Sequence, residues 1–437
     1  MEWYEAGALL LGMVIALIAL GVPVALTFMA VNIVGTLIFF GGVAGLIQVV
    51  DNSTELITRF RLAPIPIFIL MGALFFHSGL AIRVFDAIDK LFGNVPGRLC
   101  YLTVAGGATF STLTGSSMAN TAMLGSLMVP EMRRRGYSQR MSMGPVLGTG
   151  GLAMIIPPSS LGIVLASIAG VDVGRLLIAG ILPGLVLALL YGAMIFVQVS
   201  TRPGEAPRYE MARASSREKV RAVALNILPM GLVVFMVVGF IILGIATPTE
   251  AAAFGAIGVL ILTLAFRLMS RAVIVKSFTA TVRVTGMVFF IIISSTVFSQ
   301  LLATSGATGG MLTWATGLEL DATMMLVFMF AVLLLLGMFM DPVSMMLIAI
   351  PIFFPLLGPL GVDPIWFGIF MLLALEMSGT TPPFGLLLYI MLGIAPPGTT
   401  LYQVAAAAAP FLLCDAVLIG LLLAFPQIAL YLPGLMG

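Results

Sequence analysis

The sequence is poor in charge and in the residue types that most often carry catalysis. Only 9% of its 437 residues are charged, it has one histidine, and its two cysteines lie in different halves of the chain. Isolated cysteines favour free thiols in packed helices over a metal site. No phosphate loop, HExxH motif or dinucleotide fingerprint occurs, so we expect neither nucleotide hydrolysis nor a metalloprotease. A net charge of +2, with no basic stripe, gives no sign of nucleic-acid binding.

What the chain has in abundance is apolar residues, at 61%. Mean hydropathy is +1.19, which is typical of a polytopic helical membrane protein. The length suffices for roughly ten to twelve spans of about 20 residues each. The apolar N-terminal stretch lacks the basic start of a cleaved signal, so we expect a retained span with an external N-terminus.

One long apolar segment, residues 99–131, has basic residues at both ends. Arg98 precedes it, and an arginine run at 133–135 follows it. Positive residues favour the cytoplasm, so both ends are expected there. A single crossing cannot achieve this, whereas a re-entrant helical hairpin can. Its predicted tip is at residues 115–117, where small residues permit the reversal of the chain.

The next segment, residues 141–169, is interrupted twice. Glycines at 148, 150 and 151 form the first interruption, and Pro157-Pro158 forms the second. A continuous helix does not accept such a proline pair, so we expect half-helices around an unwound centre.

The second half repeats this plan. Residues 322–362 are again too long for one span, and acidic residues without basic ones flank them, which predicts an external hairpin. Residues 364–393 are interrupted at 378–383, and the two Pro-Pro pairs lie 225 residues apart, from 157 to 382. We therefore predict two inverted repeats, 1–200 and 225–437, joined by a cytoplasmic linker at 201–224. Inverted repeats with broken helices are typical of secondary transporters.

The interruptions supply oxygen atoms suited to a sodium ion. The predicted sodium ligands are Ser116, Ser117, Asn120, Thr149, Gly150, Gly151, Asp341, Ser344, Gly379, Thr380 and Thr381. The predicted substrate-binding residues are Ser116, Pro158, Ser159, Thr381 and Pro383.

Several of these residues also have a structural interpretation. The serines and the asparagine of the first hairpin could cap its arms, and Asp341 could be the N-cap before Pro342. Glu376 could relay a proton or an ion, or be paired internally. The only histidine, His77, fits packing better than a switch. Thr247 and Glu250 form a capping box, which makes Glu250 a structural residue.

Four motifs carry a resemblance to a known family. They are GSSMANTAMLGSLMVPEMRRRGY from residue 115, GTGGLAMIIPPSS from 148, MDPVSMMLIAIPIFFPL from 340 and SGTTPPFG from 378. Together they resemble the large membrane subunit of TRAP transporters, the tripartite ATP-independent periplasmic type, and the similarity runs over essentially the whole chain.

The resemblance implies an elevator-type permease that takes up organic acids with sodium, without a further cofactor and without enzyme activity. It implies two partners, a small four-helix membrane subunit and a periplasmic substrate-binding protein. The expected location is the bacterial inner membrane, with both termini periplasmic. From the residues alone, a stand-alone sodium-coupled carboxylate or ion transporter stays open. A channel fits less well, because two gated broken-helix sites suggest alternating access. An intramembrane enzyme also fits less well, because transport needs the symmetric placement of the two interrupted helices and proteolysis does not. The particular organic acid is left open.

Overall fold

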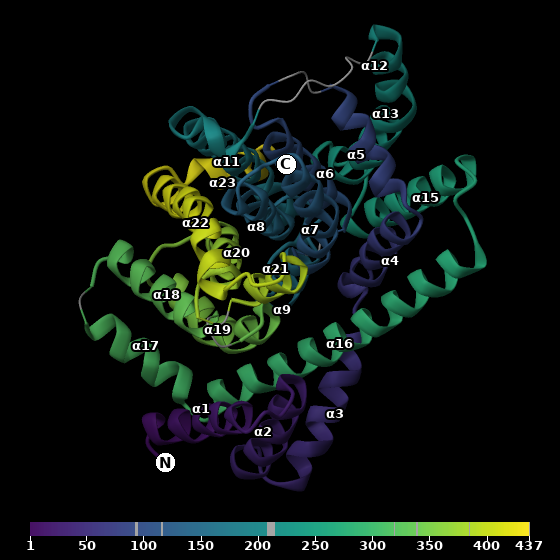
Figure 1. Cartoon of the computed structure of the whole chain (residues 1–437). Coiled ribbons are helices and arrows are strands. Elements are labelled where there is room, and N and C mark those ends of the chain that lie inside the picture. Colours follow the sequence, from purple (N-terminus) through teal and green to yellow (C-terminus); the bar gives the residue numbers. More distant parts are fainter. Residues whose placement is uncertain are drawn as a thin grey trace.

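In a computed structural model, the chain is described over residues 1–91, 95–114, 117–207, 215–318, 320–337, 340–383 and 385–436, with only the backbone at 61 and 112–114. Over these ranges it is helical, with no β-strand, which confirms the predicted all-α class (Figure 1). Five of the described helices are long and apolar enough to cross a membrane, or up to seven if each bent pair is one span.

The helices of the first half are α1 (Trp3–Ala19), α2 (Val24–Phe39), α3 (Val43–Thr58), α4 (Pro64–His77), α5 (Leu80–Leu91), α6 (Arg98–Thr114), α7 (Ser117–Arg134), α8 (Gln139–Ile155), α9 (Ser160–Ala169), α10 (Val173–Ala179) and α11 (Ile181–Thr201). Two 3-10 turns, Phe60–Leu62 and Pro203–Glu205, connect them.

The second half begins with one helical run in which α12 (Ser216–Ala222), α13 (Leu228–Val234) and α14 (Phe240–Ile242) alternate with π-helical turns at Val223–Ile227 and Phe235–Gly239. It continues with α15 (Pro248–Ala265), α16 (Arg271–Thr304), α17 (Ala307–Gly317), α18 (Ala322–Gly337), α19 (Pro342–Leu357), α20 (Pro364–Thr380), α21 (Leu386–Ile394), α22 (Leu401–Ala424) and α23 (Gln427–Gly434).

The two predicted hairpins are present as helix pairs, α6 with α7 and α18 with α19. Their tips at 115–116 and 338–339 lie outside the described residues. Where the chain resumes, α7 begins at Ser117, and Asp341 caps α19 by accepting hydrogen bonds from the backbone N–H groups of Val343 and Ser344. The N-cap interpretation of Asp341 is therefore confirmed.

The first predicted interruption of residues 141–169 is wrong, because α8 continues through residues 148–151 to Ile155. The glycines of this stretch do not unwind α8. They allow side chains of neighbouring helices to pack closely against it. A Cβ on Gly148 would lie 2.6 Å from Phe411 Cδ1 of α22, and a Cβ on Gly151 would overlap the Glu376 carboxyl group of α20. The break at Pro157-Pro158 is confirmed, and it bends α9 by 41° from α8.

The break of the second half begins later than predicted. Residues 378–380 belong to α20, which ends at Thr380, and α21 begins at Leu386. The small residues at 378–380 continue the helix, whereas the proline pair at 382–383 lacks the N–H groups that would extend it. The capping box at α15 is confirmed, since Thr247 and Glu250 bond reciprocally.

Helix α16 crosses the molecule and divides it into two groups of helices (Figure 1). On one side lie α1, α2 and α3, near the N-terminus. On the other side the two hairpins, the broken helices, α11 and α22 form a bundle. Helix α4 packs along α16 and α15 and faces this bundle.

Candidate functional site

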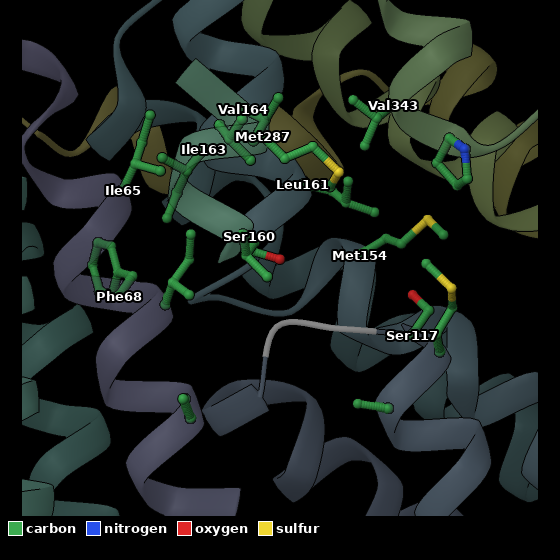
Figure 2. A pocket seen from close by; sticks show the side chains of 18 of the residues that line it. Ile65, Phe68, Ser117, Met154, Ser160, Leu161, Ile163, Val164, Met287 and Val343 are labelled. Carbon is green, nitrogen blue, oxygen red and sulfur yellow. The ribbon is translucent and has the colours of Figure 1, made fainter. Parts of the chain in front are cut away.

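A cavity of about 400 Å³ lies where both hairpins meet both broken helices. Its lining includes Ser117 and Met118 of α7, Met154 at the end of α8, and Pro342 and Val343 at the start of α19. Helices α4 and α16 close the opposite side, through residues such as Phe68 and Met287 (Figure 2). Segments from six separate parts of the chain are therefore brought to one site.

Four helices begin at the wall of this cavity. Ser117 of α7, Ser160 of α9, Pro342 of α19 and Leu386 of α21 are each the first residue of a helix, and each lines the cavity. Figure 2 shows Ser117 and Ser160 on the two sides of the space. Helix N-termini carry partial positive charge and free N–H groups, which favour a bound anion. Because the Asp341 carboxylate already occupies the N–H groups of α19, the starts of α7, α9 and α21 are the ones left for a ligand.

The remaining wall is mostly apolar. Among its described residues, the polar side chains are those of His77, Ser117, Ser160 and Ser378, and none is an arginine or lysine. A ligand held here would place an apolar body against methionine, isoleucine and phenylalanine side chains. Its charge would be met by backbone groups and not by a basic side chain.

A set of buried oxygens lies in the first turn and a half of α7. Ser117 Oγ, Asn120 Oδ1 and Thr121 Oγ1 have no hydrogen-bond partner among the described residues. The amide of Asn120 is fixed in place, because its Nδ2 donates to Thr149 O of α8 at 2.9 Å and to Ser111 Oγ of α6 at 3.2 Å. Uncharged oxygens that lack a protein donor are the ligands that a sodium ion prefers.

Close approach of α7 and α8 produces this arrangement. A Cβ on Gly150 would overlap Thr121 Oγ1 and would lie 3.6 Å from Ser117 O, so only glycine fits there. Similarly, a Cβ on Gly107 of α6 would lie 2.5 Å from the Thr149 side chain. The structure thus brings Ser117, Asn120, Thr149 and Gly150 together as predicted.

Two predicted members of the first set stand apart. Gly151 faces Glu376 on another side of α8, and Ser116 lies outside the described residues. Thr121 was missed by the sequence analysis. Its position one residue after Asn120 and four after Ser117 was the available signal, since residues four apart share a helix face.

The second predicted set differs in its hydrogen bonding. Ser344 Oγ and both nearby backbone N–H groups bond to the Asp341 carboxylate. The hydroxyls of Thr380 and Thr381 donate to Met377 O at 3.2 and 2.6 Å. Gly379 lines the cavity beside Ser378. These groups lie at the start of α19 and the end of α20. Their hydroxyl and N–H groups already donate hydrogen bonds within the chain.

The predicted substrate residues divide in the same way. Pro158 lines the cavity, whereas Ser159, Thr381 and Pro383 are not among its described lining residues. Ser159 is instead the N-cap of α9, accepting from Gly162 N and donating to Met154 O. The next residue, Ser160, lines the cavity instead.

Comparison with known proteins agrees with this architecture. The family model described as the tripartite ATP-independent periplasmic transporter, DctM component, matches residues 11–428. The C4-dicarboxylate TRAP transporter large permease protein DctM of Pseudomonas aeruginosa is 34% identical over 87% of both chains. Its namesake in Rhodobacter capsulatus is 30% identical over 98% of this chain and 99% of its own. These relatives are named as transporter permeases and not as enzymes.

A more distant relative and a solved structure also match this chain. The ectoine TRAP transporter large permease protein TeaC of Halomonas elongata is 29% identical over 96% of both chains. The solved YdaH transporter of Alcanivorax borkumensis superposes with a TM-score of 0.68 at 17% identity, over 89% of this chain and 90% of that one, and shows the fold alone. With the family model matched over residues 11–428 and a relative 34% identical, the chain belongs to the TRAP transporter large permease family, as its DctM component.

Proposed function

We propose that this permease subunit takes up an organic acid together with sodium, by an elevator movement of the bundle that carries the hairpins. The observation that carries the proposal is the single cavity at which both hairpins and both broken helices meet. In secondary transporters built from inverted repeats, half-helix N-termini hold anionic groups, and unwound carbonyls hold the coupling ion.

The cavity has the features that an organic acid requires. A carboxylate directed at the starts of α7, α9 and α21 would accept hydrogen bonds from backbone N–H groups that the helix caps leave free. The start of α19 is not available in this way, because the Asp341 carboxylate already accepts from Val343 N and Ser344 N. Three partial positive charges would then take the place of an arginine, which the described lining of the cavity lacks. The relatives named for C4-dicarboxylate and sialic acid support the organic-acid class for this chain.

Sodium is assigned to the two sets of oxygens beside the cavity. In the first set, Ser117, Asn120, Thr121 and the carbonyls near Thr149 and Gly150 are the proposed ligands. Ser116, which lies outside the described residues, is kept as a further proposed ligand. In the second set, Asp341, Ser344 and residues 379–381 remain the proposed ligands, Asp341 supplying the negative charge. Loading of these sets would hold the hairpin tips against α8 and α20, and so complete the cavity for substrate.

The moving and static parts follow from the packing. The hairpins, the broken helices, α11 and α22 pack as one bundle, and we assign them to the mobile part. Helices α1 to α4, α15 and α16 are assigned to the static scaffold, which the small membrane subunit would extend. A periplasmic binding protein would deliver the substrate. The two repeats, 1–200 and 225–437, are proposed to be inverted in the bacterial inner membrane, with linker 201–224 cytoplasmic and both termini periplasmic.

The function is tested by uptake into proteoliposomes that contain this chain, its small subunit and its binding protein. Asn120→Ala removes the amide that joins α7 to Thr149, and we expect sodium-dependent uptake to fall by about tenfold or more, as loss of roughly 1.4 kcal/mol implies. Ser126→Ala, an exposed site on the same helix, is the matched control. Uptake that needs no sodium gradient, in wild type and variants alike, would refute sodium coupling.

The inverted arrangement is tested by labelling single cysteines. Arg134→Cys follows the first hairpin, and Asp321→Cys precedes the second; both positions are exposed. An impermeant thiol reagent should reach Cys at 134 only from the cytoplasmic side and Cys at 321 only from outside. Labelling of both from one side would contradict the proposed inversion.

A further inference from the structure

Three buried polar side chains form a network inside the bundle, and none of the three is among the residues assigned to sodium. They are Tyr191 of α11, Glu376 of α20 and Asp415 of α22, with exposed fractions of 0%, 1% and 2%. Tyr191 Oη lies 2.6 Å from Asp415 Oδ1 and 3.2 Å from Glu376 Oε1. One hydroxyl group therefore bridges two carboxyl groups.

The number of hydrogens in this network determines its protonation. A tyrosine hydroxyl has one hydrogen to donate, and two ionised carboxylates could only accept. Both contacts are hydrogen bonds only if one carboxyl group is protonated and donates to Tyr191 Oη. The 2.6 Å contact has the length of a charge-assisted bond from the tyrosine to an ionised Asp415. The longer contact then leaves the proton on Glu376.

The remaining oxygen of Glu376 supports the same assignment. Glu376 Oε2 has no hydrogen-bond partner among the described residues. Burying the unpaired oxygen of a neutral acid costs far less than burying an unpaired carboxylate.

Few other titratable groups face the network. Cys414, beside Asp415, has its thiol within hydrogen-bond distance of two backbone carbonyls, Pro410 O at 3.4 Å and Leu190 O at 3.7 Å. On the helices packed around it, Arg140 lies in the first turn of α8, about three turns before Gly151. Arg98 of α6 pairs with Asp89. Within the described part of the chain, the side-chain hydrogen bonds of the network join only Tyr191, Glu376 and Asp415, and they include neither Arg175 of α10 nor the tyrosines of α6, α21, α22 and α23. Across the described ranges, neither carboxyl group forms an ion pair.

The network contacts α8, the helix that carries the Thr149 and Gly150 part of the first sodium set. The Glu376 carboxyl group lies against Gly151 of α8, where a Cβ would overlap it. The two preceding residues of α8 face α7. Gly150 lies against Thr121, and the carbonyl oxygen of Thr149 accepts a hydrogen bond from the Asn120 amide. A displacement of Glu376 would therefore act on α8, and through α8 on the oxygens of the first set.

We propose that Tyr191, Glu376 and Asp415 form a proton-binding site in which Glu376 holds the proton, and that its release weakens the adjoining sodium site. On release, the O–H bond of Glu376 breaks, its electron pair stays on the carboxylate, and the proton passes to a buffer base. Two buried carboxylates then compete for one hydroxyl and repel each other. The effect on uptake rests on the proposed function, whereas proton binding does not.

Proton binding is measured by infrared spectroscopy of the purified subunit, from about pH 5 to about pH 10. We expect a C=O band of a buried carboxylic acid that is present at neutral pH, absent at the alkaline end, and missing in Glu376→Gln at every pH. Asp415→Asn should keep a carboxylic acid band. Tyr402→Phe, an 81% exposed position on α22, is the control for Tyr191→Phe, and only the latter should shift the band.

Uptake is measured over the same pH range at fixed sodium. Wild-type uptake should fall by about tenfold where the band disappears, and Glu376→Gln, which mimics the protonated acid, should show a flat profile. A wild type without the band, a band kept in Glu376→Gln, or a Glu376→Gln profile that matches wild type would overturn the proposal. Loss of the band on adding sodium at constant pH would identify a cation site instead. If uptake proves independent of sodium while the band behaves as expected, only the proposed function fails.

Discussion

The two hairpins occupy corresponding places in their halves, yet they treat their polar groups differently. At the start of α7, three buried oxygens have no partner among the described residues. At the start of α19, the Asp341 carboxylate accepts from two backbone N–H groups and from the Ser344 hydroxyl. One half presents open acceptors, and the other satisfies its acceptors within a single helix turn.

This difference follows from the residue types. The asparagine and hydroxyls of α7 belong to residues of the helix and not to its N-cap, and their oxygens have no partner among the described residues. An aspartate directly before a proline caps the helix itself, since its carboxylate reaches the N–H groups of the next residues. Within the described residues, the first half therefore leaves acceptors open, whereas the second half holds its carboxylate in place.

The largest expected effect contrasts two glycines, one from each predicted sodium set. A Cβ on Gly150 would overlap Thr121 Oγ1, whereas a Cβ on Gly379 would lie 3.6 Å from Leu387, an ordinary contact. Gly150→Ala should force α7 from α8 and reduce uptake by more than about tenfold, while Gly379→Ala should stay within about twofold. Uptake and thermal unfolding of both purified variants measure this. Equal losses would mean that the two halves pack alike.

A more selective effect is expected at Asp341. Asparagine is as good an N-cap as aspartate, so Asp341→Asn should keep α19 stable while removing the charge, and sodium-dependent uptake should be lost. Asp341→Ala should in addition lower the free energy of unfolding by about 1 kcal/mol. Both are followed by sodium titration of uptake and by thermal unfolding.

The matched control for this change is another aspartate before a proline. Asp363 caps α20 through the N–H groups of Ile365 and Trp366, and it is exposed. Asp363→Asn should leave both stability and sodium dependence unchanged. If Asp341→Asn behaves in the same way, Asp341 is a cap without an ion-binding role.

Much of this arrangement could be predicted from local patterns. Basic flanks and small residues located the first hairpin, proline pairs located both breaks, and Thr247 with Glu250 located the start of α15. These signals are local because caps, breaks and helix ends depend on neighbouring residues. The glycines of α8 were misinterpreted for the opposite reason, since their role is to admit Phe411 and Glu376, which lie far away in the chain.

The network of buried acids could not be predicted from local patterns either. Tyr191 is 185 residues from Glu376 and 224 from Asp415, and no spacing rule joins them. Glu376 alone attracted attention as an acid in an apolar segment. Its partners became visible only when α11, α20 and α22 were packed together. Likewise, only the packing brings four helix starts to one cavity.

The smallest expected effect tests the hydroxyls themselves. Thr121 Oγ1 has no partner in the described part of the chain, whereas Thr380 Oγ1 donates to Met377 O. In sodium-free buffer, Thr121→Val should stabilise the protein by about 1 kcal/mol, because it removes an unpaired buried hydroxyl, and Thr380→Val should destabilise it by about as much. With sodium present, Thr121→Val should need several-fold more sodium for half-maximal stabilisation, and Thr380→Val should need a smaller increase. Thermal unfolding over a sodium titration gives both quantities, and a Thr121→Val protein that is less stable without sodium would show that this hydroxyl is already bonded within the chain.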